Sequence, residues 1–203
     1  MERQIILLIS DMRQIYLAEI LTKRGNHVRC LDIRNQDTIE EQLAKLKVFL
    51  NEADVLILPI PVSKGIREEE LNEILNKYVK KDTLVMGGCF FEEQQKILED
   101  RGISYLDFME DEIVTEENAV ATAEGAIAEL VRNCPYNIEG SKVIVTGYGC
   151  CGKAIAKKLG AMGARVTVLA RRSEVRKQAK ADGFYAVDFA FGPEESMGTV
   201  MLV

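Results

Sequence analysis

The residues Val143-Ile-Val-Thr-Gly-Tyr-Gly-Cys-Cys-Gly152 decide the fold of this chain. Gly147, Gly149 and Gly152 form the pattern G-x-G-x-x-G directly after an apolar, strand-like run, and apolar residues recur with helical spacing after it. In such a unit the first glycine allows a tight turn, the second lets a pyrophosphate approach the backbone, and the third lets helix and strand pack closely. A second β-rich run over residues 166–170 completes a strand–helix–strand context. That context favours a dinucleotide-binding unit over a glycine-rich turn without a ligand.

The end of the second strand of such a unit reports which dinucleotide binds. An acidic residue there binds the ribose 2′-hydroxyl of NAD, whereas arginines accommodate the 2′-phosphate of NADP. In this chain that end is Ala170, and Arg171-Arg172-Ser173 follows with no carboxylate before Glu174. Unless both arginines simply point into solvent, their guanidinium groups can hold a phosphate, so we expect NADP, with NAD as the alternative. The expected cofactor-binding residues are Gly147, Tyr148, Gly149, Cys150, Cys151, Gly152, Ala170, Arg171, Arg172 and Ser173.

The composition is that of an ordinary globular protein. The chain has 203 residues, 47% of them hydrophobic and 29% charged, and its formal net charge is −6. Because the charges are interspersed, nothing resembles the basic surface that binds nucleic acid. No apolar run approaches the ~20 residues of a membrane-spanning helix. The short run at residues 5–9 reads as a first strand rather than as a signal peptide. We expect a cytoplasmic protein without nucleic-acid or membrane partners.

The five cysteines show no C-x-x-C spacing, and the single histidine is too few for the common zinc sites. We therefore expect reduced thiols and no metal. Cys150 and Cys151 fall in the phosphate-binding turn, where a helix N-terminus can lower the pKa of a thiol. The motif places no requirement on the residue type at these two positions, so we interpret both cysteines as tolerated small residues rather than as reactive thiols.

The first 110 residues alternate strand-like and helix-like patterns with short connections. Strands are expected at residues 4–9, 27–32, 54–59, 83–86 and 104–108, and helices at residues 13–23, 39–50, 68–80 and 92–100. This alternation predicts a doubly wound parallel sheet, whose ligands lie outside the carboxyl ends of the strands. The expected pocket rim is therefore Ser10-Asp11, residues 59–64 and Gly87-Gly-Cys89.

A change of pattern after residue 110 marks the domain boundary. Residues 110–117 are acidic, and residues 118–132 are alanine-rich and helix-permissive apart from Gly125, which needs a packing or ligand reason. We expect a substrate domain at residues 1–115, a connecting helix at 116–135 and a dinucleotide-binding Rossmann domain at 136–203. The fold class is α/β, with two doubly wound parallel-sheet domains.

Four blocks of sequence resemble one enzyme family in their order and spacing. They are residues 57–63, 118–126, 145–152 and 163–173. Together they resemble the A subunit of dipicolinate synthase, over a span from the N-terminus to residues 187–189. The resemblance implies a cytoplasmic protein of spore-forming bacteria that uses NAD(P) to oxidise a hydroxylated tetrahydrodipicolinate, a dicarboxylic substrate, to dipicolinate. It also implies a partner, the flavoprotein-like B subunit of dipicolinate synthase, and we expect a homo-oligomer such as a dimer.

The chain departs from this family pattern at two points. Ala121 stands where the family usually has proline before Thr-x-Glu-Gly, which leaves the roles of Thr122 and Glu124 open. After the glycine motif only three strands can be counted, at residues 142–146, 165–170 and 184–187, before residues 192–196 and an apolar end that could add one strand. Since a dinucleotide fold has two mononucleotide halves, we expect the Rossmann domain to be truncated.

Three functions remain open. The first is an oxidoreductase of the dipicolinate synthase type, with Ser63, Thr122 and Glu124 as catalytic candidates and Lys64 beside them. We exclude His27 as the base because it lies at the amino-terminal end of its strand. The second is a nucleotide-binding or interaction protein without catalysis, and the third is a different two-domain dehydrogenase that acts on 2-hydroxy or amino acids.

Overall fold

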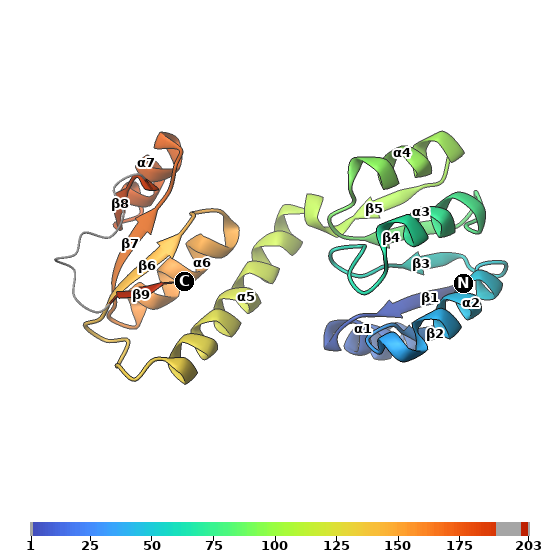
Figure 1. Ribbon diagram of the computed structural model, residues 1–203, viewed down its shortest axis with the longest axis horizontal. Helices are drawn as coiled ribbons and strands as arrows, with labels where there is room; N and C mark the ends of the chain where they lie inside the picture. Colours follow the sequence, from blue (N-terminus) through green and yellow to red (C-terminus); the bar gives the residue numbers. More distant parts are fainter. Residues whose placement is uncertain (1, 190–199, 203) are drawn as a thin grey trace. The chain divides into compact units, whose positions relative to one another are not determined.

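The computed structural model describes residues 2–189 and 200–202 and is shown in Figure 1. The first unit, Met1–Asp111, contains a parallel sheet in the order β2-β1-β3-β4-β5. Its strands are β1 (Gln4–Ile9), β2 (His27–Asp32), β3 (Val55–Ile57), β4 (Leu84–Gly87) and β5 (Tyr105–Asp107). Its helices are α1 (Met12–Lys23), η1 (Gln36–Thr38), α2 (Ile39–Phe49), α3 (Glu68–Lys77), α4 (Glu92–Arg101) and η2 (Phe108–Glu110).

Both faces of this sheet are covered, which explains why β1 reads as one continuous apolar run. On one face Ile6 and Leu8 pack in a cluster with buried leucines and isoleucines of α2, α3 and α4. On the other face Ile5 and Leu7 pack in a cluster with Ala18 of α1. The predicted doubly wound parallel sheet is thereby confirmed, and its strand order reverses between β1 and β3.

The second unit, Glu112–Val203, contains a parallel sheet in the order β8-β7-β6-β9. Its strands are β6 (Lys142–Thr146), β7 (Arg165–Leu169), β8 (Tyr185–Val187) and β9 (Val200–Leu202), and its helices are α5 (Glu112–Asn133), α6 (Cys150–Ala161) and α7 (Ser173–Ala181). The apolar end of the chain does supply a strand, since β9 pairs in parallel with β6. The segment at residues 192–196 lies outside the described residues.

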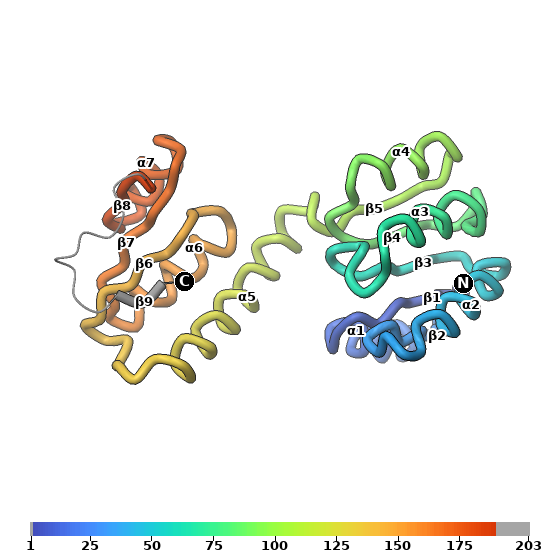
Figure 2. The backbone as a smooth tube through the Cα atoms, in the orientation of Figure 1, coloured from blue at the N-terminus to red at the C-terminus, as the bar shows by residue number. Residues whose placement is uncertain are grey.

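Helix α5 differs from the expected connecting helix at residues 116–135. It begins at Glu112, because the acidic residues before position 118 suit the positive end of the helix dipole. It also belongs wholly to the second unit, where Ala123 is buried in one core with Ile155 and Leu159 of α6. Figure 2 shows the chain running along α5 and returning through β6 into α6.

Other differences are confined to the ends of elements. Strand β3 stops at Ile57 rather than at Pro59, because proline has no N–H to donate to a neighbouring strand. Packing against the described residues does not explain the glycine at position 125, since a Cβ atom added to it would meet no atom within 4 Å.

Candidate functional site

Two of the three motif glycines are required by the fold itself. Gly147 has φ +94°, a conformation that side chains rarely adopt, and its N–H donates to the carbonyl of Leu169 at 2.8 Å, which ties the turn to β7. At Gly152 an added Cβ would lie 2.5 Å from the carbonyl oxygen of Gly147. The start of α6 therefore packs against the turn so closely that only glycine fits at position 152.

Gly149 is different, because the protein does not require glycine there. Its φ of −78° and ψ of −166° are open to any residue. An added Cβ would meet none of the described atoms within 4 Å. Gly149 is also the N-cap of α6, and no side chain caps that end of the helix. No side chain therefore occupies the first N–H groups of the helix, and such uncapped N–H groups are the ones that bind a phosphate.

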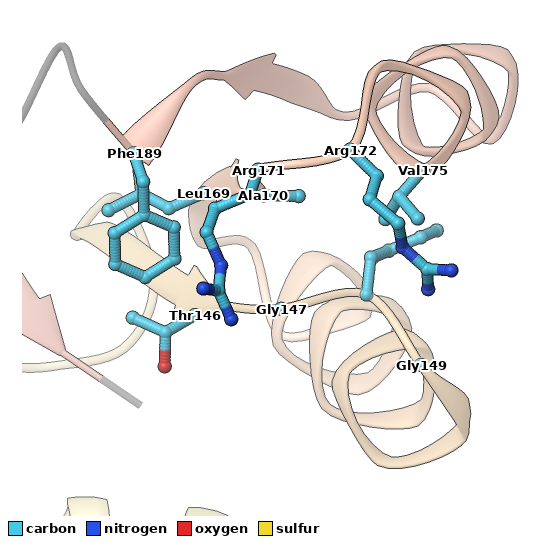
Figure 3. Close-up of a pocket in the computed structure, with 10 residues that line it drawn as sticks. Thr146, Gly147, Gly149, Leu169, Ala170, Arg171, Arg172, Val175 and Phe189 are labelled. Atoms are coloured by element: carbon cyan, nitrogen blue, oxygen red, sulfur yellow. The ribbon is translucent and has the colours of Figure 1, made fainter.

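A cleft of about 720 Å³ lies over this turn. It is shown in Figure 3 and is lined by Thr146, Gly147, Tyr148, Gly149, Leu169, Ala170, Arg171, Arg172, Val175 and Phe189. The glycine turn forms its floor, and Arg171 and Arg172 both extend from the end of β7 toward that turn. The structure thus brings six of the expected cofactor residues to one cleft, namely Gly147, Tyr148, Gly149, Ala170, Arg171 and Arg172.

The other four expected cofactor residues do not line this cleft. Cys150 and Cys151 are exposed free thiols on the first turn of α6, and Cys150 borders a neighbouring hollow of about 340 Å³ between α5 and α6. Gly152 serves packing. Ser173 begins α7 and its hydroxyl donates to the carboxylate of Glu174 at 2.7 Å, which lowers the pKa of Glu174.

Arg176 fixes the loop that carries the two exposed arginines, and the sequence patterns did not point to it. Its guanidinium donates to the carbonyls of Ala170 at 2.7 Å and of Arg171 at 2.5 Å. It also forms an ion pair with Asp188 at 2.6 Å, and both side chains are mostly buried. Arg176 is therefore bonded to the backbone of the loop, whereas Arg171 and Arg172 line the cleft. Phe189 and Val175 were likewise missed as cleft residues, since they join it only through the pairing of β7 with β8 and the start of α7.

Tyr148, the variable residue between the first two glycines, is anchored in the core. It is 3% exposed, and its hydroxyl donates to the carboxylate of Asp182 at 2.8 Å. Burial and the neighbouring Asp182 carboxylate raise the pKa of Tyr148 well above its usual value. The phenol therefore stays protonated at neutral pH and holds the turn against the end of α7.

The catalytic candidates lie in different units and have local partners. Ser63 is half-buried in the turn after β3, where its carbonyl accepts a hydrogen bond from Ile66 at 3.1 Å. Thr122 donates its hydroxyl proton to the carbonyl of Asn118 at 2.8 Å within α5. Glu124 forms an ion pair with Lys158 at 2.9 Å, which ties α5 to α6. His27 is an exposed residue paired with Glu2 at the start of β2.

The carboxyl edge of the first sheet gathers charge around Asp11. The Asp11 carboxylate accepts from Arg13 at 2.7 Å and from Lys64 at 2.8 Å, while it also caps α1. The hydrogen bonds from Arg13 and then from Lys64 hold the pKa of Asp11 far below its usual range, against the opposing effect of burial. At the end of β5 the buried Asp107 accepts hydrogen bonds from the N–H groups of Cys89 at 3.1 Å and Phe90 at 3.0 Å, which follow β4. Asp11, Lys64 and Cys89 of the expected rim therefore take part in hydrogen bonds at this edge of the sheet, while the pocket itself stays a prediction.

Metal and membrane features are absent from residues 2–189 and 200–202. No three histidine, cysteine or carboxylate side chains there come together as metal ligands. None of the helices in that part of the chain combines the length and the apolar character needed to cross a bilayer.

Comparisons with known proteins identify relatives for both units. The family model for the N-terminal domain of the dipicolinate synthase A subunit matches residues 10–109. The dipicolinate synthase A subunit of Bacillus subtilis is 43% identical over 56 residues, which is 28% of this chain and 19% of that protein. The solved structure of the dipicolinate synthase A subunit from Bacillus halodurans matches with a TM-score of 0.63 at 19% identity, over 93% of this chain and 68% of that one.

This chain is a protein similar to the A subunit of dipicolinate synthase. The likeness covers the first unit by family model and both units by fold. In the second unit, the model of the acetohydroxy acid isomeroreductase NADPH-binding domain matches residues 137–201, which supports a nicotinamide cofactor. A second relative is S-inosyl-L-homocysteine hydrolase of Methanocaldococcus jannaschii, 27% identical over 182 residues, which is 83% of this chain. The chain spans 40% of the length of that hydrolase.

Proposed function

We propose that this chain binds NADP in the cleft over Gly147–Gly149 and acts as an oxidoreductase on the substrate of dipicolinate synthase. One observation carries the choice of nucleotide. At the end of β7, where a carboxylate would bind the ribose of NAD, two exposed arginines extend over the cleft instead. The match of the second unit to an NADPH-binding domain supports the same choice.

Each part of the cleft has a distinct role in holding the cofactor. The uncapped start of α6 presents N–H groups to the pyrophosphate, and the open surface at Gly149 lets it come close. Arg171 and Arg172 hold the 2′-phosphate through charge-assisted hydrogen bonds. Arg176 keeps both arginines in place by its bonds to the backbone. The bound nicotinamide supplies a two-electron acceptor.

The reaction that we propose converts hydroxy-tetrahydrodipicolinate into dipicolinate. The ring becomes aromatic by loss of water, of one hydride to the cofactor and of one proton. Ser63, Thr122 and Glu124 are our candidates for moving that proton, and Glu124 could do so only after its ion pair with Lys158 opens. We further propose a cytoplasmic protein of spore-forming bacteria that forms a homo-oligomer, such as a dimer, and works with the flavoprotein-like B subunit of dipicolinate synthase.

The test has two stages. The first compares the affinities of NADPH and NADH for the chain, and equal or tighter binding of NADH would refute the choice of NADP. The second measures NADPH formation from hydroxy-tetrahydrodipicolinate in the presence of the flavoprotein-like partner. Absence of turnover in a longer relative that carries the same residues would reject the substrate assignment.

The likeness to S-inosyl-L-homocysteine hydrolase over 83% of the chain favours a second candidate function. In that case the same cleft would hold a nicotinamide cofactor in an enzyme whose net reaction is hydrolysis of a nucleoside thioether. Incubation with S-inosyl-L-homocysteine would then release inosine and homocysteine without net reduction of the cofactor.

A further inference from the structure

We propose that Lys64 binds a carboxylate group of the substrate at the carboxyl edge of the first unit. The nature of that substrate rests on the proposed function, whereas the site itself rests on the first unit alone. Three features support it: the way in which Lys64 is held, the polar side chains close to Asp11 in the sequence, and its position in the sheet.

The ion pair with Asp11 orients Lys64 but leaves part of its ammonium group accessible. Its ammonium group donates to Asp11 at 2.8 Å, and its side chain is still 40% exposed. An ammonium has three N–H donors, so the single bond to Asp11 leaves two for a ligand. Asp11 meanwhile shares its carboxylate with the backbone N–H and the guanidinium of Arg13. The negative charge beside Lys64 is therefore divided between two cations, and Lys64 can attract a further anion.

Two polar side chains come from residues close to Asp11 in the sequence. The hydroxyl of Ser10, which precedes Asp11, is buried and has no hydrogen-bond partner among the described residues. Gln14 is only 5% exposed, and its side-chain oxygen accepts from the N–H of Asp11 at 2.8 Å. A buried polar group without a partner is uncommon in folded proteins, so the Ser10 hydroxyl is an unsatisfied hydrogen-bonding group at the end of β1.

The position of Asp11 and Lys64 is the one at which open parallel sheets bind ligands. Asp11 follows β1 and Lys64 follows β3, and these two strands flank the point where the strand order reverses. The short turn at residues 61–66 brings Lys64 back over the end of β1, because its backbone N–H is bonded to the carbonyl of Pro61 at 2.9 Å. A carboxylate held there would lie outside the carboxyl ends of both strands.

The experiment measures binding of pyridine-2,6-dicarboxylate to the full chain by ligand-observed NMR, with pyridine as the probe that lacks carboxylates. Replacing Lys64→Ala should raise the Kd for the dicarboxylate about tenfold, since a hydrogen bond to a charged group is lost. Lys64→Arg should keep the Kd within about threefold of the wild-type value, because the charge remains. Lys77→Ala is the matched control, as Lys77 is an exposed lysine paired with Glu73 on α3.

Asp11→Asn separates a binding role from a merely structural one. Asparagine also caps helices well, so α1 should be retained while Lys64 loses its anionic partner. If Lys64 binds the ligand, this variant should bind the dicarboxylate as tightly as wild type or tighter. If Lys64 only latches the turn to α1, Asp11→Asn should weaken binding as much as Lys64→Ala, and the proposal is wrong. Unchanged binding by Lys64→Ala, or no binding by the wild type, overturns it as well.

NADPH titrations of the same variants distinguish this proposal from the proposed function. All of them should bind NADPH like the wild type, because the nucleotide cleft lies in the second unit. A wild-type chain that binds the dicarboxylate through Lys64 but not NADPH would refute the proposed function and support the carboxylate site.

Discussion

Replacing Arg171 and Arg172 together with alanine should abolish any preference of this chain for NADPH over NADH. A hydrogen bond to a charged group contributes about 1.5–3 kcal/mol when it is well formed. Both arginines are exposed at the rim of the cleft, so the lower end of that range applies to each. Each single variant should therefore raise the Kd for NADPH about tenfold, since 1.4 kcal/mol corresponds to a factor of ten.

The double variant should lose between about tenfold and one hundredfold, because neighbouring residues that share one ligand are seldom additive. NADH, which has no 2′-phosphate, should change by less than about threefold. Isothermal titration of both nucleotides at two salt concentrations provides the measurement, because exposed charge pairs weaken with ionic strength. Arg132→Ala is the matched control, since Arg132 is an exposed arginine of α5 paired with Glu129.

Two results would refute the reasoning. One is a wild-type chain that binds NADH as tightly as NADPH, which means that the arginines point away from the ligand. The other is an equal loss of NADH and NADPH binding in the double variant, which means that the arginines support the shape of the cleft rather than the phosphate.

The remaining predictions concern the turn, its support and the edge of the first sheet. Gly149→Ala should leave the melting temperature unchanged but weaken the binding of NADPH, while Gly152→Ala should lower the melting temperature. A lower melting temperature for Gly149→Ala, or an unchanged one for Gly152→Ala, would contradict the packing seen at the turn. Arg176→Ala should weaken the binding of NADPH and NADH alike, because the substitution loosens the whole loop at the end of β7. Weaker binding of NADPH alone would show instead that Arg176 contacts the 2′-phosphate. Asp11 has a lowered pKa, so its ionisation stabilises the fold fully above the ordinary aspartate pKa of about 3.9, and this stabilisation is lost as the pH falls below it. The difference in unfolding free energy between wild type and Asp11→Asn should thus be constant above about pH 5 and shrink below about pH 4, and a difference that changes near neutral pH would contradict this.

The sequence predicted the strands and the nucleotide turn well because their signals are local. Buried parallel strands are apolar on both faces, so β1 stands out as a run of isoleucines and leucines. The glycine pattern has fixed spacing, and the strand before it and the helix after it are also visible in the sequence. Arg171 and Arg172 could also be found from the sequence, because one helix and one strand set the number of residues between them and the first glycine.

Features that depend on tertiary contacts were not predictable. Nothing in the sequence indicates that Arg176 bonds to the backbone of its own loop, because any exposed helical arginine gives the same pattern. The packing partner of α5 was equally hidden, since an apolar stripe shows that a helix face is buried but not against what. Asp107 reads as an ordinary residue at a strand end, yet it is buried and bonds to the N–H groups of the turn after β4.

The contrast between Gly149 and Gly152 has a consequence for how such a chain changes over generations. Folding alone would keep glycine at position 152, where even a methyl group meets a carbonyl oxygen, but folding places no such demand on position 149. A lineage that ceased to use nucleotides could therefore replace Gly149 freely and still produce a well-folded protein. The residue at position 149 therefore reports on nucleotide binding, whereas the residue at position 152 reports on folding. This chain has glycine at both positions.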